Sequence, residues 1–299
     1  MKGFLRNIFV FSLLIIVPLV LAEVYVRSLP NPSRYKHEWM LRHSGEVETL
    51  VLGSSHTFYG ISPSLLGEGA FSLAQPSQTY RYDYYLLTRY NMPRLKTVIL
   101  PFSYTSLFED IEAEKTLHPW AVRYRLYMDC DIHSPLSEYG FEFMHISAFK
   151  EKLGSLFRPA RLSWDSQGYG TSYGEQSLLA EGKGDAKARV EQCTYPEMKS
   201  LAFCTAILDS ICSFCEKRDI SLLLVSTPLS KEFLRRRSNR QVAVADSTLR
   251  RVMERHPSVR YQDYRTDTTF HVTDFYDFDH LNMIGAAKLT RKVREQVGR

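Results

Sequence analysis

Short apolar runs alternate with longer amphipathic stretches along most of the chain, and this alternation constrains the fold more than any other feature of the sequence. Four runs have the composition of buried strands, and each is followed by Gly, Ala, Pro or Ser-Thr-Pro: residues 50–52, 70–73, 98–100 and 222–225. Four stretches carry apolar residues at helical spacing: residues 80–90, 197–217, 242–254 and 283–297. Strands that alternate with helices predict an α/β fold, a three-layer α/β/α sandwich whose central parallel sheet is covered on both faces.

One long segment, residues 111–196, interrupts the alternation and is expected to be an insertion in the domain. Its first part is rich in aromatic side chains, and its later part turns loop-like at residues 164–170. The aromatic residues are Trp120, Tyr124, Tyr127, Tyr139, Phe141 and Trp164. Two interpretations stay open: the insertion walls a sugar or acyl pocket at the strand ends, or its rings pack a helical excursion onto the sheet.

The N-terminal segment predicts a membrane anchor or a signal peptide over residues 1–27. Lys2 and Arg6 precede an uncharged, almost wholly apolar stretch, residues 8–22, which Glu23 ends. The stretch is short against the ~20 residues that span a bilayer, but its apolar flanks can lengthen it if the charged side chains reach the interface. The positive flank predicts a cytoplasmic N-terminus, with the rest of the chain on the periplasmic or extracytoplasmic side.

A removable signal peptide is the alternative, because residues 20–22 (Val-Leu-Ala) would pass as a small-residue cleavage site and release a secreted protein. An uncleaved anchor is favoured, since no polar cleavage region follows the apolar stretch. Residues 28–44, with Pro30 and Pro32, are expected to form a linker, and residues 45–299 an α/β domain that contains the insertion.

The composition limits which partners and which cysteine or metal sites are expected. The chain is 44% hydrophobic, which is ample for a core, and its formal charge of +5 is too mild and interspersed to indicate a nucleic-acid partner. The five cysteines allow at most two disulfides: Cys130, Cys193, Cys204, Cys212 and Cys215. The last two fall late in a helical pattern and predict buried thiols, not a redox pair. A zinc site would need a second pair at ligand spacing, so no metal site is predicted.

Two short signatures supply the residues of a nucleophilic site. Residues 53–56 (Gly-Ser-Ser-His) follow the first predicted strand, and residues 277–282 (Asp-Phe-Asp-His-Leu-Asn) precede the last predicted helix. A serine hydroxyl is a poor nucleophile at neutral pH, so it needs an imidazole to take its proton and a carboxylate to hold that imidazole. We therefore expect the two signatures to meet in space, at the carboxyl ends of the strands.

The signatures resemble two blocks of the SGNH (GDSL-type) hydrolases. The commoner Gly-x-Ser-x-Gly esterase pattern fails because Thr57 stands at its final glycine. The Gly-Asp-Ser block of the SGNH family lines up with residues 53–55, and its Asp-x-x-His block lines up with Asp277 and His280. The resemblance implies a flavodoxin-like sheet, with Ser55 as nucleophile, His280 as general base and Asp277 as the carboxylate that orients the base.

Asp279 and His56 lie beside the predicted catalytic residues in the sequence, and a different role is expected for each. Asp279 is the adjacent alternative to Asp277 as the orienting carboxylate. His56 lies beside the nucleophile in the sequence, where a side chain usually points elsewhere, so it is given no catalytic role. The resemblance covers most of the chain after about residue 45, and the insertion has no counterpart in it.

Two departures from the family concern the groups that would stabilise an oxyanion. Ser77 stands where these enzymes have a glycine that contributes an amide, and their third block, Gly-x-Asn-Asp, is missing. The chain instead has Pro-Phe-Ser-Tyr at residues 101–104, which looks like the membrane-anchored proteins that transfer D-alanine to teichoic acids and the related polysaccharide O-acetyl transfer proteins. The remaining donors are the Ser55 amide, a backbone amide near Ser77 and the Gln78 side chain.

The resemblance implies an extracytoplasmic serine acyltransferase or esterase that acts on a cell-surface polysaccharide, by O-acetyl transfer through an acyl-Ser55 intermediate. Its expected partners are a glycan acceptor, an acyl donor delivered by a multi-span membrane acyltransferase, and the membrane itself. No metal and no organic cofactor is implied. Two alternatives stay open: a carbohydrate O-deacetylase of the same fold, and a non-catalytic glycan-binding or scaffold subunit of an envelope acylation complex.

Overall fold

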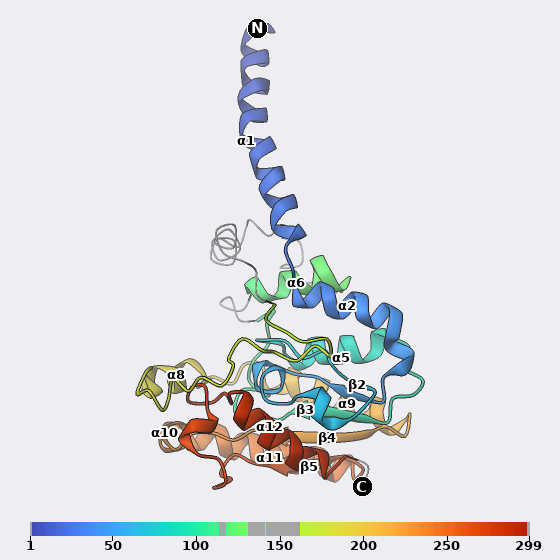
Figure 1. Ribbon diagram of the computed structural model, residues 1–299, viewed down its shortest axis with the longest axis vertical. Helices are drawn as coiled ribbons and strands as arrows, with labels where there is room; N and C mark the ends of the chain where they lie inside the picture. Colours follow the sequence, from blue (N-terminus) through green and yellow to red (C-terminus); the bar gives the residue numbers. More distant parts are fainter. Residues whose placement is uncertain (1, 114–117, 131–140, 142–161, 298–299) are drawn as a thin grey trace.

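The computed structural model describes residues 2–113, 118–130, 141 and 162–297, and within them five parallel strands form one sheet (Figure 1). The strand order is β2-β1-β3-β4-β5. The strands are β1 (Thr49–Val51), β2 (Ala70–Ser72), β3 (Thr97–Pro101), β4 (Ser221–Ser226) and β5 (Arg260–Asp263). This order places β1 between β2 and β3, so the chain reverses its direction of winding there, and such a switch point opens a crevice at the carboxyl ends of the strands.

The four apolar runs of the sequence are confirmed as β1 to β4, and the predicted α/β fold class is confirmed. The periodicity did not predict β5, because Arg260–Asp263 is polar and its side chains are half-buried or exposed. An edge strand buries less of its surface than a central strand, so it lacks the apolar run that marks the others.

Both faces of the sheet are buried under helices. Successive side chains of a strand point to opposite faces, so Leu50 and Leu52 join one hydrophobic core while Val51 joins the other. The first core contains residues of α5 (Tyr80–Arg89), α9 (Leu201–Glu216) and α11 (Asn239–Arg255). The second contains residues of α4 (Pro63–Leu66) and α12 (Met283–Arg294). The predicted helices are thereby confirmed as α5, α9, α11 and α12.

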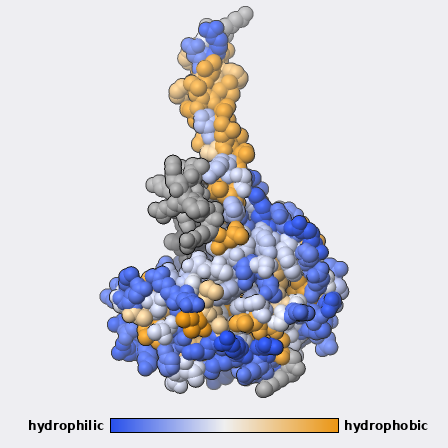
Figure 2. Space-filling model, viewed as in Figure 1, coloured by the Kyte–Doolittle hydropathy of each residue, from blue (hydrophilic) through white to orange (hydrophobic). Residues whose placement is uncertain are grey.

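Helix α1 (Lys2–Ser28) extends away from the domain, and its surface is hydrophobic over most of its length, with hydrophilic residues near its N-terminal end (Figures 1 and 2). Its segment Gly3–Ser28 has a mean hydropathy of 2.5 over its most apolar window. At about 1.5 Å per residue the helix is longer than the ~30 Å hydrocarbon core of a bilayer. Length and composition thus fit a membrane span, and a signal sequence would meet the same criterion.

Helix α2 (Pro32–His43) corrects the expectation of a linker at residues 28–44. The Asn31 side chain accepts hydrogen bonds from the first backbone amides of the helix, and Pro32 occupies its first position. Lys36 and Met40 are fully buried, and Lys36 Nζ donates to the carbonyl of Ala74 after β2. A proline in the first turn starts a helix as readily as it marks a linker, so the sequence signal was ambiguous. The α/β domain therefore includes this helix.

The described parts of the expected insertion include helices α6 (His118–Met128) and α8 (Ala186–Gln192). Helix α6 packs against α2, and its Tyr124 is fully buried beside Tyr82 of α5, with ring centroids 3.9 Å apart. Trp164 is also buried, whereas Trp120 is 42% exposed. Tyr139 lies outside the described residues. Packing onto the sheet domain thus explains Tyr124.

All five cysteines are free and buried. Cys212 and Cys215 lie on the core face of α9, and burial raises the pKa of each thiol to about 12. The prediction of buried helix-face thiols is confirmed for this pair. The remaining described helices are η1 (Ser44–Glu46), α3 (Ser55–Phe58), α10 (Lys231–Arg236) and η5 (Val272–Asp274).

Candidate active site

The serine signature forms a tight turn at the end of β1. Gly53 has a φ of +106°, and a Cβ placed on it would lie 2.1 Å from Pro101 Cγ at the end of β3, so a side chain has no room there. The Gly53 N–H donates to Asp83 Oδ1 at 2.7 Å, which ties the turn to helix α5. Ser55 is the first residue of the short helix α3 and lies half-buried at the switch point of the sheet.

The histidine signature forms a loop fixed by its own side chains. Asp277 Oδ1 accepts the backbone N–H of Asp279 at 3.1 Å and that of His280 at 2.9 Å. Asn282 is fully buried and caps α12, because its Oδ1 accepts the N–H of Gly285 at 3.0 Å while its Nδ2 donates to backbone carbonyls. These bonds hold His280 just before the start of α12.

The two signatures meet, although 225 positions separate the serine from the histidine. Ser55 Oγ lies 2.8 Å from His280 Nε2. His280 Nδ1 lies 3.0 Å from each carboxylate oxygen of Asp277. A proton on Nδ1 then binds the carboxylate, and the lone pair of Nε2 faces the serine hydroxyl. This is the tautomer that a base needs in order to take a proton from the serine.

Electrostatics favour a protonated imidazole at His280, which is only 5% exposed. Burial by itself lowers the pKa of His280, but the charges of Asp279 and Asp277 outweigh it and raise this pKa above its ordinary value. A base with a raised pKa accepts a proton more readily, provided that the pH keeps it neutral at the start.

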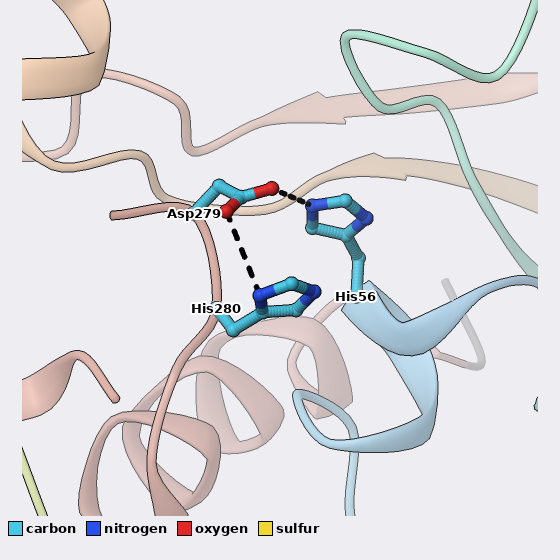
Figure 3. Close-up of side chains that lie close together, drawn as sticks. All are labelled: His56, Asp279 and His280. Carbon is cyan, nitrogen blue, oxygen red and sulfur yellow. Dashed lines mark hydrogen bonds and ion pairs between the residues drawn. The ribbon is translucent and has the colours of Figure 1, made fainter. Parts of the chain in front are cut away.

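Asp279, the alternative carboxylate, has its own set of partners (Figure 3). It is 2% exposed, and Arg189 of α8 donates to both of its oxygens at 2.7 and 2.8 Å. His56 Nε2 lies 3.1 Å from Oδ2, while His280 Nδ1 lies 3.5 Å from Oδ1, farther than from Asp277. Asp277 is therefore the closer hydrogen-bond acceptor of His280, and Asp279 is a neighbour held by other groups.

The expectation that His56 points away from the site is wrong. Its imidazole stacks on that of His280, with ring centroids 4.8 Å apart and planes 17° apart, and its Nδ1 lies 3.2 Å from Ser54 Oγ. The loop that carries Asp279 folds over the first turn of α3, and this long-range packing gives His56 a buried partner. Sequence reasoning also missed Arg189, whose position 90 residues before Asp279 follows no recognised spacing.

The residues expected to stabilise an oxyanion lie on the loop between β2 and α5. Ser77 has a φ of +58°, the left-handed region that favours glycine, which fits its alignment with a glycine of the SGNH family. Gln78 is buried, donates from Nε2 to Asp83 Oδ1 at 2.6 Å and accepts from the Tyr124 hydroxyl at 2.8 Å. Gln78 thus serves to fix this loop, and at most its second amide hydrogen is free to donate elsewhere.

Asp83 joins the two halves of this region and was missed by the sequence reasoning. Its Oδ1 accepts from Gly53 of the serine turn and from Gln78 of the β2–α5 loop. Burial raises the pKa of Asp83 to about 7, although the two donors work in the opposite direction. A cavity of about 10 Å³ beside it is lined by Ser54, Gln78 and hydroxyl groups after β3, and it has room for about one water-sized group.

Three tyrosines, one of them from the insertion, form an aromatic wall beside the histidine. Tyr173 meets the His280 ring edge-on at 5.7 Å, and it stacks on Tyr59 at 3.7 Å and on Tyr276 at 3.8 Å. All three tyrosines are half-buried. The described end of the insertion therefore contributes to the surroundings of the site, through Tyr173 and through Arg189.

A metal ion would have few ligands to use in this cluster. Among the described residues, His56, Asp279 and His280 lie close enough to one another for a shared cation. Both oxygens of Asp279 already face the Arg189 guanidinium, however, and His280 is bonded to Ser55 and Asp277. The donor set fits acid–base chemistry better than metal binding.

Comparisons with known proteins give only distant similarities. No family model matches the sequence, and no curated protein matches it. Similar solved structures include a GDSL-like lipase from Bacteroides thetaiotaomicron, with 11% identity and a TM-score of 0.41 over 89% of this chain and 99% of that chain. A lipase/acylhydrolase from Enterococcus faecalis has 12% identity and a TM-score of 0.38 over 84% and 97%.

A third similar structure, from Streptococcus pneumonia, is provisionally described as a platelet activating factor. It has 10% identity and a TM-score of 0.44 over 96% of this chain and 98% of that chain. Identities of 10 to 12% and TM-scores below 0.5 do not assign the chain to a family or an activity. The geometry of the site therefore carries the proposal that follows.

Proposed function

We propose that the chain is an SGNH-type serine acyltransferase or esterase, and that it moves acetyl groups on a cell-surface polysaccharide on the extracytoplasmic side of a membrane. The observation that carries this proposal is the continuous chain from Ser55 Oγ through His280 to Asp277, with separations of 2.8 and 3.0 Å. A non-catalytic scaffold needs no such chain, so the geometry favours the two enzymatic alternatives.

The reaction uses each of these groups in turn. Ser55 Oγ attacks the carbonyl carbon of an acyl donor while His280 Nε2 takes the hydroxyl proton, and Asp277 stabilises the imidazolium. The Ser55 amide and the backbone at Ser77 are the proposed donors to the oxyanion. The intermediate collapses as His280 returns the proton to the leaving group, which leaves an acyl ester on Ser55. A sugar hydroxyl or water then attacks this ester while His280 takes its proton, and His280 returns that proton to Ser55 Oγ as the acyl group leaves the serine.

Three features support transfer to a glycan at a membrane. Helix α1 fits an anchor by length and composition. The tyrosine wall at Tyr59, Tyr173 and Tyr276 places aromatic surface next to the base, where a sugar ring would pass. The sequence after β3 looks like that of membrane-anchored acyl transfer proteins. We further propose a multi-span membrane acyltransferase as the source of the acyl group.

The test is intact-mass analysis of the full chain in detergent micelles, mixed with an activated acetyl ester. We expect one acetyl adduct on the wild-type protein, none on Ser55→Ala, and a retained adduct on Ser54→Ala, the matched control on the neighbouring hydroxyl. If the adduct decays faster with added oligosaccharide than in water, the result supports the transferase. If the decay rate does not change with added oligosaccharide, it supports the deacetylase. Absence of any adduct on the wild-type protein would contradict the proposed catalysis.

A further inference from the structure

Asp277 already accepts the proton on His280 Nδ1, so the buried carboxylate of Asp279, 3.5 Å from the same nitrogen, is a second negative group beside it. Asp279 is almost fully enclosed, at 2% exposure. A buried carboxylate without partners destabilises the fold, so its presence here requires compensating contacts. The structure supplies three of them from two other elements, which indicates a defined role beside His280.

The first compensating group is the guanidinium of Arg189 on α8. It donates from Nε to Oδ1 at 2.7 Å and from Nη2 to Oδ2 at 2.8 Å, a two-pronged arrangement that fixes the plane of the carboxylate. Burial would raise the pKa of Asp279, but the charge of His280 and the hydrogen bonds from His56 and Arg189 hold this pKa well below its usual range. The carboxylate is thus an anion at neutral pH.

The second group is His56, whose two ring nitrogens both have partners. A proton on Nε2 binds Asp279 Oδ2 at 3.1 Å, and Nδ1 then accepts the hydroxyl proton of Ser54 at 3.2 Å. Asp279 fixes this ring from behind, so His56 stacks in register on His280 with the planes 17° apart. Two serine–histidine–aspartate sets therefore lie side by side, and the carboxylate of Asp279 lies close to both histidines.

We infer that Asp279 is a second positioning carboxylate for His280, and that Arg189 and His56 are the groups that hold it in place. This inference rests on the proposed function for its catalytic meaning. The charged and titratable groups that face His280 are Asp277 and Asp279 of its own loop, His56 of α3, Tyr173 of the insertion and Arg189 of α8. Among them Asp279 adds negative charge and Arg189 opposes it.

This arrangement makes a signed prediction. Removal of the Asp279 charge with Asp279→Asn lowers the pH at which His280 titrates, by about one unit for a charge within 4 Å. Removal of the opposing charge with Arg189→Gln raises the same midpoint. Arg189→Lys keeps the charge, so its midpoint stays near the wild-type value. If the carboxylate of Asp279 did not act on the His280 ring, Asp279→Asn would leave the midpoint unmoved.

The experiment is an NMR pH titration of the full chain in detergent micelles with isotope-labelled histidine. His280→Gln identifies the signal of His280 among the nine histidines. Asp274→Asn is the matched control, because Asp274 of η5 is also buried and paired with a cation, but its carboxylate binds Lys288 and the backbone N–H of His271. It should leave the midpoint unchanged.

An unmoved midpoint in Asp279→Asn, or shifts of the same sign in Asp279→Asn and Arg189→Gln, would overturn the inference. If Arg189→Gln does not fold, Arg189→Lys and Asp279→Asn still test it. A second measurement separates the proposed function from the inference about Asp279: the rate at which a fluorophosphonate labels Ser55, measured against pH. No labelling of the wild type contradicts the proposed function while the titration stays informative, whereas normal labelling with an unmoved midpoint contradicts the inference alone.

Discussion

Ser54 and Ser55 are neighbours in the sequence, and each hydroxyl faces the imidazole of a histidine backed by an aspartate. Ser55 lies 2.8 Å from His280, whose partner Asp277 is bound by backbone amides of its own loop. Ser54 lies 3.2 Å from His56, whose partner Asp279 is bound on both oxygens by Arg189. The two serine–histidine–aspartate sets thus have the same residue types but differ at the carboxylate. Backbone amides bind Asp277, whereas the Arg189 cation binds Asp279.

The difference shows why motif residues alone do not define a nucleophile. The carboxylate that accepts the proton of a catalytic histidine stabilises the imidazolium that forms on it. Asp277 is the closer acceptor for His280, whereas the carboxylate of Asp279 also binds Arg189 and His56. The comparison predicts that loss of the Ser55 hydroxyl lowers turnover far more than loss of the Ser54 hydroxyl.

The largest expected effect is that of Ser55→Ala. Loss of the nucleophile should lower acyl-ester turnover by at least about 10³-fold, because only binding and the oxyanion groups remain. Steady-state hydrolysis of an activated acetyl ester by the full chain in micelles measures it. Equal losses from Ser54→Ala and Ser55→Ala would remove the distinction between the two sets.

The next effect is that of Asp277→Asn. An amide in place of this carboxylate favours the wrong histidine tautomer and removes a charge that stabilises the imidazolium, so we expect turnover to fall by about 10³-fold or more. The KM for the ester should change little, since Asp277 has no predicted contact with the substrate. A loss below about tenfold would shift the orienting role to Asp279.

The dependence of turnover on pH tests whether His280 is the base that takes the proton of Ser55. The His280 imidazole must be neutral to act as the base, so turnover should fall about tenfold for each pH unit below its pKa. Because this pKa is raised, the acidic limb should lie above the ordinary value of about 6.5. The same shift makes protonated His280 stabilise the fold below about pH 6.5, a contribution that is lost as the pH rises through the raised pKa. An acidic limb below pH 6 would contradict the assignment.

Asp83→Ala is expected to weaken the turn that both serines share. It removes the acceptor for Gly53 and Gln78, and the resulting misplacement of Ser55 should lower turnover by about tenfold. Asp83→Asn is the matched control, since its carbonyl can accept both hydrogen bonds. Because burial raises the pKa of Asp83 to about 7, ionisation of this group should destabilise the wild type as the pH rises from about 4 to 7, and Asp83→Asn should lack this pH dependence in denaturant unfolding.

The smallest effect is expected for Ser54→Ala. This change removes one hydrogen bond of 3.2 Å to His56, and a single bond of this kind is worth about 0.5 kcal/mol, so turnover should fall about twofold. The same ester assay measures it. A loss greater than about thirtyfold would show that the second set takes part in the chemistry.

The sheet and its covering helices were predictable, because burial on both faces gives a strand an uninterrupted apolar run and burial on one face gives a helix its periodicity. The runs at β1 to β4 carry this signal. Strand β5 and helix α2 do not: β5 is polar at the sheet edge, and the prolines that begin α2 also mark linkers. Both became structured through packing against parts of the chain that a local pattern does not reveal.

For the site, the sequence by itself determined that a serine would follow β1 and that an aspartate and a histidine would precede α12, since strand ends and helix starts follow from local pattern. The tertiary structure decided the rest. It brought His56 and Arg189 to Asp279 across 223 and 90 residues, and it left Asp277 as the nearer acceptor for His280. The two carboxylates lie 3.0 and 3.5 Å from the same ring nitrogen of His280. So small a difference depends on how the elements pack, and no spacing of residues along the chain encodes it.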